Sequence, residues 1–167
     1  MALTAFLYGS PKAALAKTDA LIKEMPGNPY LHELRGDTLI KLNKAGDAAL
    51  AYQKAMKLDP EGSPLLQTSY GQALLLAGKP DAAKKELAAA LARDKDNTAA
   101  YQYLAQAYGQ TGDVANAELA TADMHYYGGD KKQARIFAAR AQRQLKTGSP
   151  GWLRAQDIIT NKPKKKK

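Results

Sequence analysis

His32 and His125 are the two histidines of the chain, and His32 begins the one stretch that approaches a catalytic motif. In the H-E-x-x-H motif, two histidines on one face of a helix bind zinc and the glutamate acts as a general base. His32-Glu33 supplies the first half, but Gly36 stands at the position of the second histidine. The sequence therefore predicts neither a catalytic residue nor a metal site in this chain, and we interpret both histidines as helix-packing residues.

Ser63 and Ser149 each lie in a Gly-Ser-Pro sequence, which does not match the G-x-S-x-G motif of nucleophilic serines. A serine followed by proline is typical of a helix start, where serine caps the first turn and proline takes the first helical position. The glycines are scattered between predicted helices and form no phosphate-binding loop. We therefore predict that this chain is not an enzyme.

The elements that position these residues follow a repeat. Matched alanines recur after 34, 35, 34 and 17 residues, at Ala14, Ala48, Ala83, Ala117 and Ala134. A small residue about every 34 positions is typical of arrays of helical hairpins, whose two helices cross too closely for a large side chain. Good helix formers dominate, whereas Val occurs once and Ile five times, so a β-sheet domain is not expected.

The matched positions resemble the tetratricopeptide repeat (TPR) family, whose pattern combines large, small and glycine positions over two helices. The best-matched set is Tyr101, Leu104, Ala105, Tyr108, Gly112 and Ala117, and an earlier one is Gly36, Leu39, Asn43, Ala48, Tyr52, Ala55 and Pro60. The resemblance implies an all-α fold, a TPR α-solenoid of antiparallel helix hairpins with a C-terminal capping helix. The turn position holds residues that tolerate a left-handed backbone: Gly9, Asn43, Gly78, Gly112 and Gly129.

The expected solenoid covers residues 1–160. Because Gly112-Asp113 and Gly129-Asp130 are only half a repeat apart, the second helix of one hairpin should serve as the first helix of the next. The expected segments are a partial repeat at about 1–27, repeats at 29–62, 64–97 and 98–127, an overlapping half-repeat at 113–146, and a cap at 149–160. The lysine-rich residues 161–167 are expected to form a disordered tail.

Three stretches resemble a narrower group, the C-terminal TPR region of bacterial M48-type zinc metallopeptidases, which include the β-barrel assembly-enhancing protease. They are residues 27–36, 104–109, and 138–143 together with 148–158, the last containing Gly-Ser-Pro-Gly-Trp-Leu-Arg-Ala. The resemblance implies a zinc protease domain elsewhere in a longer protein, a periplasmic or envelope location, and outer-membrane assembly machinery or client polypeptides as partners. No cofactor is expected in this chain itself. The alternative is a stand-alone TPR scaffold or adaptor without a protease.

A TPR solenoid implies a concave groove lined by the inward positions of each first helix, and we predict that polypeptides bind there by stacking and backbone hydrogen bonds. For Tyr126 and Tyr127, packing between repeats is the alternative. Glu33 and Asp37 would repel a C-terminal carboxylate, which argues against a carboxylate clamp. The predicted partner-binding residues are Tyr30, Glu33, Asp37, Gln72, Gln102, Tyr103, Gln106, Asp123, Tyr126 and Tyr127.

The formal charge of +9 is concentrated near the C-terminal end, where Lys162 and Lys164–Lys167 lie. Attraction of these lysines to an anionic membrane surface, at about 1 kcal/mol per charge, is a weak alternative to a solvated tail. Sequence-specific nucleic-acid binding is not expected, because no aromatic residues are interleaved with the lysines. The sequence shows no signal peptide pattern and no apolar run long enough to span a membrane. The oligomeric state stays open.

Overall fold

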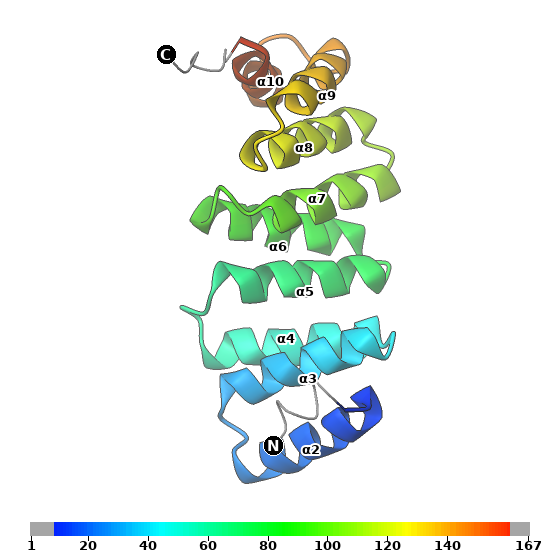
Figure 1. The fold of residues 1–167 in the computed structure, drawn as a ribbon, viewed down its shortest axis with the longest axis vertical. Helices are drawn as coiled ribbons and strands as arrows, with labels where there is room; N and C mark the ends of the chain where they lie inside the picture. Colours follow the sequence, from blue (N-terminus) through cyan, green and yellow to red (C-terminus); the bar gives the residue numbers. More distant parts are fainter. Residues whose placement is uncertain (1–8, 161–167) are drawn as a thin grey trace. The chain divides into compact units, whose positions relative to one another are not determined.

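The computed structural model describes residues 9–160. This part of the chain consists of α-helices joined by short turns, and none of its helices is long and apolar enough to cross a membrane (Figure 1). The first eight residues of the predicted partial repeat and the predicted tail at 161–167 lie outside the described residues. The helices are α2 (Pro11–Glu24), α3 (Pro29–Lys41), α4 (Ala45–Leu58), α5 (Pro64–Leu76), α6 (Pro80–Arg93), α7 (Thr98–Gln110), α8 (Val114–Tyr127), α9 (Lys131–Gln144) and α10 (Pro150–Thr160).

Short polar side chains start the helices. The hydroxyl of Ser63 accepts a hydrogen bond from the Leu66 backbone N–H, and that of Ser149 accepts one from Trp152, both at 3.3 Å. Each serine satisfies one of the N–H groups that a helix leaves unpaired in its first turn. Their predicted role as N-caps is therefore confirmed.

The turns between paired helices use left-handed residues at the predicted positions. Asn43, Gly78, Gly112 and Gly129 have φ angles of 57°, 73°, 77° and 90°. The reversed backbone lets the next N–H return to the helix, as where the Asp113 N–H donates to the Tyr108 carbonyl at 3.0 Å. These bonds satisfy carbonyl groups at the end of the first helix and direct the chain into the second.

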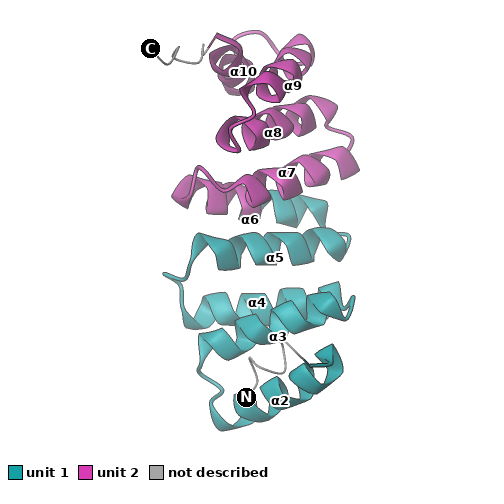
Figure 2. Ribbon diagram, viewed as in Figure 1, with its two compact units in different colours: residues 1–86 teal, residues 87–167 magenta. Residues whose placement is uncertain are grey.

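The chain divides into two compact units, and the boundary falls inside α6, between Glu86 and Leu87 (Figure 2). Unit 1 contains α2 to α5 and the first part of α6. Unit 2 contains the rest of α6 and α7 to α10. Each unit is described by itself below.

In unit 1 the helices approach closely through small residues. Ala14 and Ala48 are fully buried, and Tyr52 of α4 lies against Gly36 of α3. A Cβ atom on Gly36 would lie 2.5 Å from the Tyr52 ring carbon Cε1, so only glycine fits there without a shift of the ring. The predicted glycine and aromatic positions of this repeat thus form one contact.

In unit 2, α9 packs on α8 and α10 packs on both. The core of this region is made almost entirely of small residues, and Ala117, unlike the other matched alanines, is only half-buried. The matched alanine Ala134 and Ala138, one helical turn later, place α9 in this core. The fully or almost fully buried residues of this cluster are Ala122, Ala134, Ala138, Ala155 and Ile158.

Candidate functional site

One face of α3 brings together three of the predicted binding residues. Tyr30, Glu33 and Asp37 are spaced by three and four residues, so their side chains follow one another along the same side of the helix. With Leu31 and Leu34 they line a cavity of about 320 Å³, which we call the α3 cavity. Tyr30 is 72% exposed and stands at its open side.

The start of α3 is fixed locally. The Asn28 side chain accepts a hydrogen bond from the Tyr30 N–H at 3.0 Å, and Pro29 occupies the first helical position. A capped first turn with a proline holds the backbone of Tyr30 in a defined orientation. The aromatic ring is therefore presented from a rigid support, although it is itself in solvent.

The α3 cavity is acidic. Burial raises the pKa of Glu33, and the nearby charge of Asp37 raises it further. The Tyr52 hydroxyl donates to Asp37 Oδ1 at 2.6 Å, which holds this carboxylate in place from α4. Within the part of the chain that the structure describes, neither Glu33 nor Asp37 forms an ion pair. Two carboxylates thus share a partly buried space without a cation.

The corresponding face of α5 lies in the same unit, and α5 contacts α3 directly. Gln72, another predicted residue, is half-buried on this helix. Leu65 and Leu76 are 62% and 59% exposed. Leu65 follows Pro64 as Tyr30 follows Pro29, so both first helices present a large apolar side chain at their second position.

In unit 2, the predicted residues of α7 also share one side of their helix. Gln102 and Gln106 are exposed, and Tyr103 is half-buried. Amide side chains offer both donors and acceptors to a polypeptide backbone. This face is therefore polar, in contrast to the apolar and acidic faces of α3 and α5.

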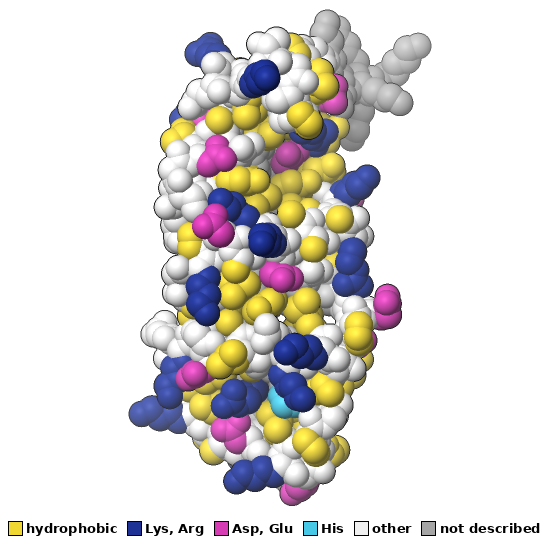
Figure 3. Space-filling model, turned by 180° about the vertical axis from the view of Figure 1, so that it is seen from behind, with side chains coloured by type: hydrophobic (Ala, Val, Ile, Leu, Met, Phe, Trp, Pro, Cys, Tyr) yellow, Lys and Arg dark blue, Asp and Glu magenta, His cyan; other side chains and the backbone are white. Residues whose placement is uncertain are grey.

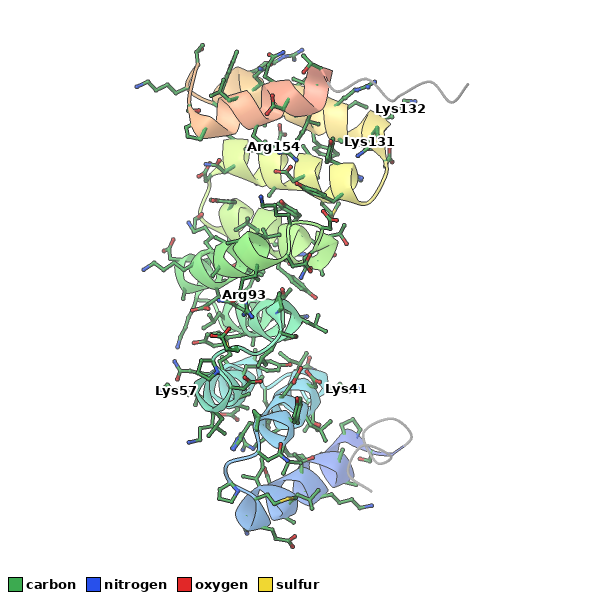
Figure 4. All side chains as sticks on the ribbon, turned by 90° about the vertical axis from the view of Figure 1, so that its left-hand side faces the viewer. Lys41, Lys57, Arg93, Lys131, Lys132 and Arg154 are labelled. Carbon is green, nitrogen blue, oxygen red and sulfur yellow. The ribbon has the colours of Figure 1, made fainter. Side chains whose placement is uncertain are left out.

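Asp123, Tyr126 and Tyr127 are engaged within unit 2. Arg154 of α10 donates to Asp123 Oδ1 from Nε at 2.8 Å and from Nη2 at 2.6 Å (Figure 4). Its guanidinium carbon lies 5.0 Å and 5.6 Å from the ring centres of Tyr126 and Tyr127. Asp123 is only 7% exposed. For Tyr126 and Tyr127, these contacts correspond to the packing alternative.

Two members of this cluster were not among the predicted site residues, Tyr101 and Arg154. The Tyr101 ring stacks on Tyr127 with a centroid distance of 5.5 Å, and burial raises the pKa of its hydroxyl. Burial also raises the pKa of Asp123, against the opposing effect of Arg154. The one sequence signal for Arg154 was the Trp-Leu-Arg-Ala segment that contains it. The site prediction considered only the inward positions of the helices and so did not include this residue.

The histidines pack between helices, as predicted. His32 is buried, and its Nε2 lies 2.9 Å from the Pro26 carbonyl oxygen. The His125 ring stacks on Phe137 at a centroid distance of 5.5 Å. Among residues 9–160, no group of three or more His, Cys, Asp or Glu side chains is arranged to hold a metal ion.

Comparison with known proteins supports the fold. The family model for the tetratricopeptide repeat matches residues 64–107. A crystal structure of MamA superposes with a TM-score of 0.75 at 20% identity, covering 95% of this chain and 90% of MamA. MamA from Desulfovibrio magneticus RS-1 gives 0.73 at 19% identity, covering 95% and 87%.

A third structure, YrrB, is described as a TPR protein with an unusual peptide-binding site. It superposes with a TM-score of 0.60 at 16% identity, covering 93% of this chain and 88% of YrrB. A search of curated protein sequences gives no match. At these identities the similarity establishes the fold alone. The chain therefore contains a tetratricopeptide repeat and folds as an all-α TPR solenoid of antiparallel helix hairpins.

Proposed function

We propose that this chain is a protein-interaction scaffold, which binds polypeptide segments on the faces of α3 and α5 in unit 1 and, independently, on the face of α7 in unit 2. The observation that carries the proposal is the solvent-exposed apolar surface of unit 1. Tyr30, Leu65 and Leu76 are large side chains with more than half of their surface in solvent, and they lie on first helices of the hairpins. Exposed apolar and aromatic residues beside a cavity are typical of binding surfaces. The TPR fold is consistent with this role.

The mode of binding follows from the residue types. In unit 1, the apolar side chains of α3 and α5 suit side chains of a bound polypeptide. In unit 2, the glutamines of α7 suit a polypeptide backbone or polar side chains. YrrB, a TPR protein with an unusual peptide-binding site, supports the idea that this fold accepts peptides. A surface built in this way gains affinity from several modest contacts rather than from one deep site.

The test is selection of binding peptides from a random library with the full chain as bait, followed by affinity measurement on variants. Tyr30→Ala combined with Leu65→Ala should weaken the selected peptides at least tenfold. Leu50→Ala is the matched control, because Leu50 is 65% exposed but lies on α4, a second helix. If the selected peptides bind the double variant and the control equally well, the proposed surface is wrong.

A second proposal concerns the parent protein. The segment that contains Arg154 is also the part of the chain that most resembles M48-type metallopeptidases. We propose on this basis that the chain recruits substrates or outer-membrane assembly partners to such an envelope protease. The comparisons add no support for this link, and a stand-alone scaffold agrees with them equally well. An antibody raised against the chain distinguishes the two. A much larger polypeptide in the periplasmic or membrane fraction supports the protease, and a cytosolic band of the size of this chain opposes it.

A further inference from the structure

We propose that the α3 cavity receives a lysine or arginine side chain of the bound polypeptide. This inference rests on the proposed function, and it adds the chemical class of the partner. The occupant we infer is a basic residue next to an apolar one, within an extended or helical segment of a protein partner.

The first support is the lining of the cavity. Lysine and arginine have an apolar stem and a charged head, and such side chains place the stem on apolar surface while the head finds a charge. Leu31 and Leu34 offer the apolar wall, and Glu33 and Asp37 offer the carboxylates one helical turn apart. The Tyr30 ring at the opening adds a face on which a cation is attracted by the aromatic quadrupole.

The second support is the absence of a cation from the chain's own described residues. Within the described part of unit 1, two other carboxylates have basic partners, Asp19 with Arg35 at 2.7 Å and Asp81 with Lys84 at 2.8 Å. Glu118 pairs with Arg140, and Asp123 pairs with Arg154. Glu33 and Asp37 have no such pair among residues 9–160. Their mutual repulsion and the burial of Glu33 disfavour the charged state, and a bound cation would relieve both effects.

The charge of the rest of the chain makes this cavity distinctive. The chain has 25 Lys and Arg residues against 16 Asp and Glu residues. Lys and Arg side chains are spread over the face drawn in Figure 3, with Asp and Glu scattered among them. An acidic cavity attracts a cationic segment, whereas the Lys and Arg side chains elsewhere on the surface repel it.

The other cavities of unit 1 have a different character. One of about 290 Å³ has Arg35 and Lys54 in its lining, and one of about 420 Å³ has Lys12 and Lys44 together with a single carboxylate, Asp19. The acidic groups at the α3 cavity are therefore not a general property of the grooves between these helices. Two carboxylates are also fewer ligands than the six to eight oxygens that Ca²⁺ takes, which favours a side-chain cation over a metal ion.

The experiment uses the full chain and a peptide array with randomised apolar flanks and a central lysine, arginine, norleucine or glutamate. Norleucine keeps the stem of lysine and removes the charge. We expect lysine and arginine peptides to bind at least tenfold more tightly than norleucine peptides, and glutamate peptides to bind weakest. Glu33→Gln should reduce the preference for lysine over norleucine to less than threefold, whereas binding of the norleucine peptides should persist. Glu24→Gln is the matched control, since Glu24 is an exposed glutamate at the end of α2.

The outcomes separate this inference from the proposed function. If norleucine peptides bind as tightly as lysine peptides, and this binding is lost in the Tyr30 and Leu65 variant, the scaffold proposal stands and the basic occupant is wrong. If a lysine preference survives both Glu33→Gln and Asp37→Asn in variants with unchanged helical circular dichroism, the cation binds elsewhere. If no peptide binds the wild-type chain, both proposals fail.

Discussion

Arg154 donates twice to a single oxygen, Asp123 Oδ1, with its Nε at 2.8 Å and its Nη2 at 2.6 Å. The bond joins the last described helix, α10, to α8, and the two residues are 31 positions apart in the chain. The aromatic rings of Tyr126 and Tyr127 lie beside the guanidinium group. This pair therefore links α10 to α8 beside the alanine-rich core of unit 2.

Removing the basic partner should destabilise unit 2. Arg154→Ala leaves the Asp123 carboxylate buried without its cation, which typically costs about 3–5 kcal/mol for a fully buried pair. Because the Arg154 side chain is 32% exposed, we expect a smaller loss in the free energy of unfolding, about 2 kcal/mol. Urea unfolding followed by the fluorescence of Trp152, the one tryptophan, measures it on α10 itself. Arg143→Ala, an exposed arginine on α9, should change the midpoint little, and equal effects of the two substitutions would contradict the role of the pair.

The protonation of Asp123 should give unit 2 an unusual pH dependence. Burial raises its pKa in the folded state above the ordinary value of 3.8, so the folded protein binds this proton more tightly than the unfolded chain does. The contribution to stability is then fully present below pH 3.8 and is lost as the pH rises through the raised pKa. The groups that interact with Asp123 are Arg154 and the Tyr101 hydroxyl, and both keep their protons in this range.

Asp123→Asn removes this titration while keeping the shape of the side chain. The unfolding free energies of wild type and variant are measured by Trp152 fluorescence from pH 3 to 7. As the pH rises, the wild type should therefore lose stability relative to the variant. A difference that moves in favour of the wild type would mean that attraction to Arg154 outweighs the burial of the carboxylate.

The helix ends and the α3 face could be predicted because they depend on local chemistry. A serine before proline caps a helix wherever it occurs, and glycine at the turn permits the left-handed backbone measured at Gly112. Helical periodicity alone places Glu33 and Asp37 on one side of α3. These inferences need only neighbours within about one turn.

The environment of Asp123 could not be predicted in the same way. Its partner, Arg154, lies in α10. The repeat pattern assigns inward positions by comparison with earlier hairpins, and these have no capping helix that could supply such a partner. The same limit applies to Tyr127, whose stacking on Tyr101 brings α8 to α7. Which polar side chains meet across three helices depends on tertiary packing, and the matched positions carry no information on it.

The contact between Gly36 and Tyr52 predicts a steric effect in unit 1. Gly36→Ala places a methyl group 2.5 Å from the Tyr52 ring, which is buried and cannot move outward freely. Overpacking of this kind typically costs about 1–3 kcal/mol, more than the helix propensity gained from alanine. Gly46→Ala is the control, because a Cβ atom there meets nothing within 4 Å. Urea unfolding followed by far-ultraviolet circular dichroism should show a destabilised Gly36 variant and a neutral or slightly stabilised Gly46 variant, and the reverse order would contradict the packing.

The acidic cavity predicts that binding of a lysine peptide depends on pH. Burial and the charge of Asp37 raise the pKa of Glu33 above its ordinary value of 4.5, so acid protonates Glu33 before most surface glutamates. The charged groups around it are Asp37 on the same helix, Lys41 one turn further on (Figure 4), and Arg35, which is already paired with Asp19 of α2. The Tyr52 hydroxyl donates to Asp37 from α4.

A lysine peptide should therefore bind more tightly as the pH rises through the raised pKa of Glu33, whereas a norleucine peptide of the same sequence should show no such gain. When Glu33 is protonated, the carboxylate pair keeps only half of its negative charge. The affinity for lysine should therefore fall several-fold on the acid side. Titration calorimetry from pH 4 to 7.5 measures both peptides. Glu33→Gln should remove the pH dependence and leave the weaker acid-side affinity at every pH. A lysine peptide whose affinity for that variant still rises over the same range would show that a different carboxylate holds the cation.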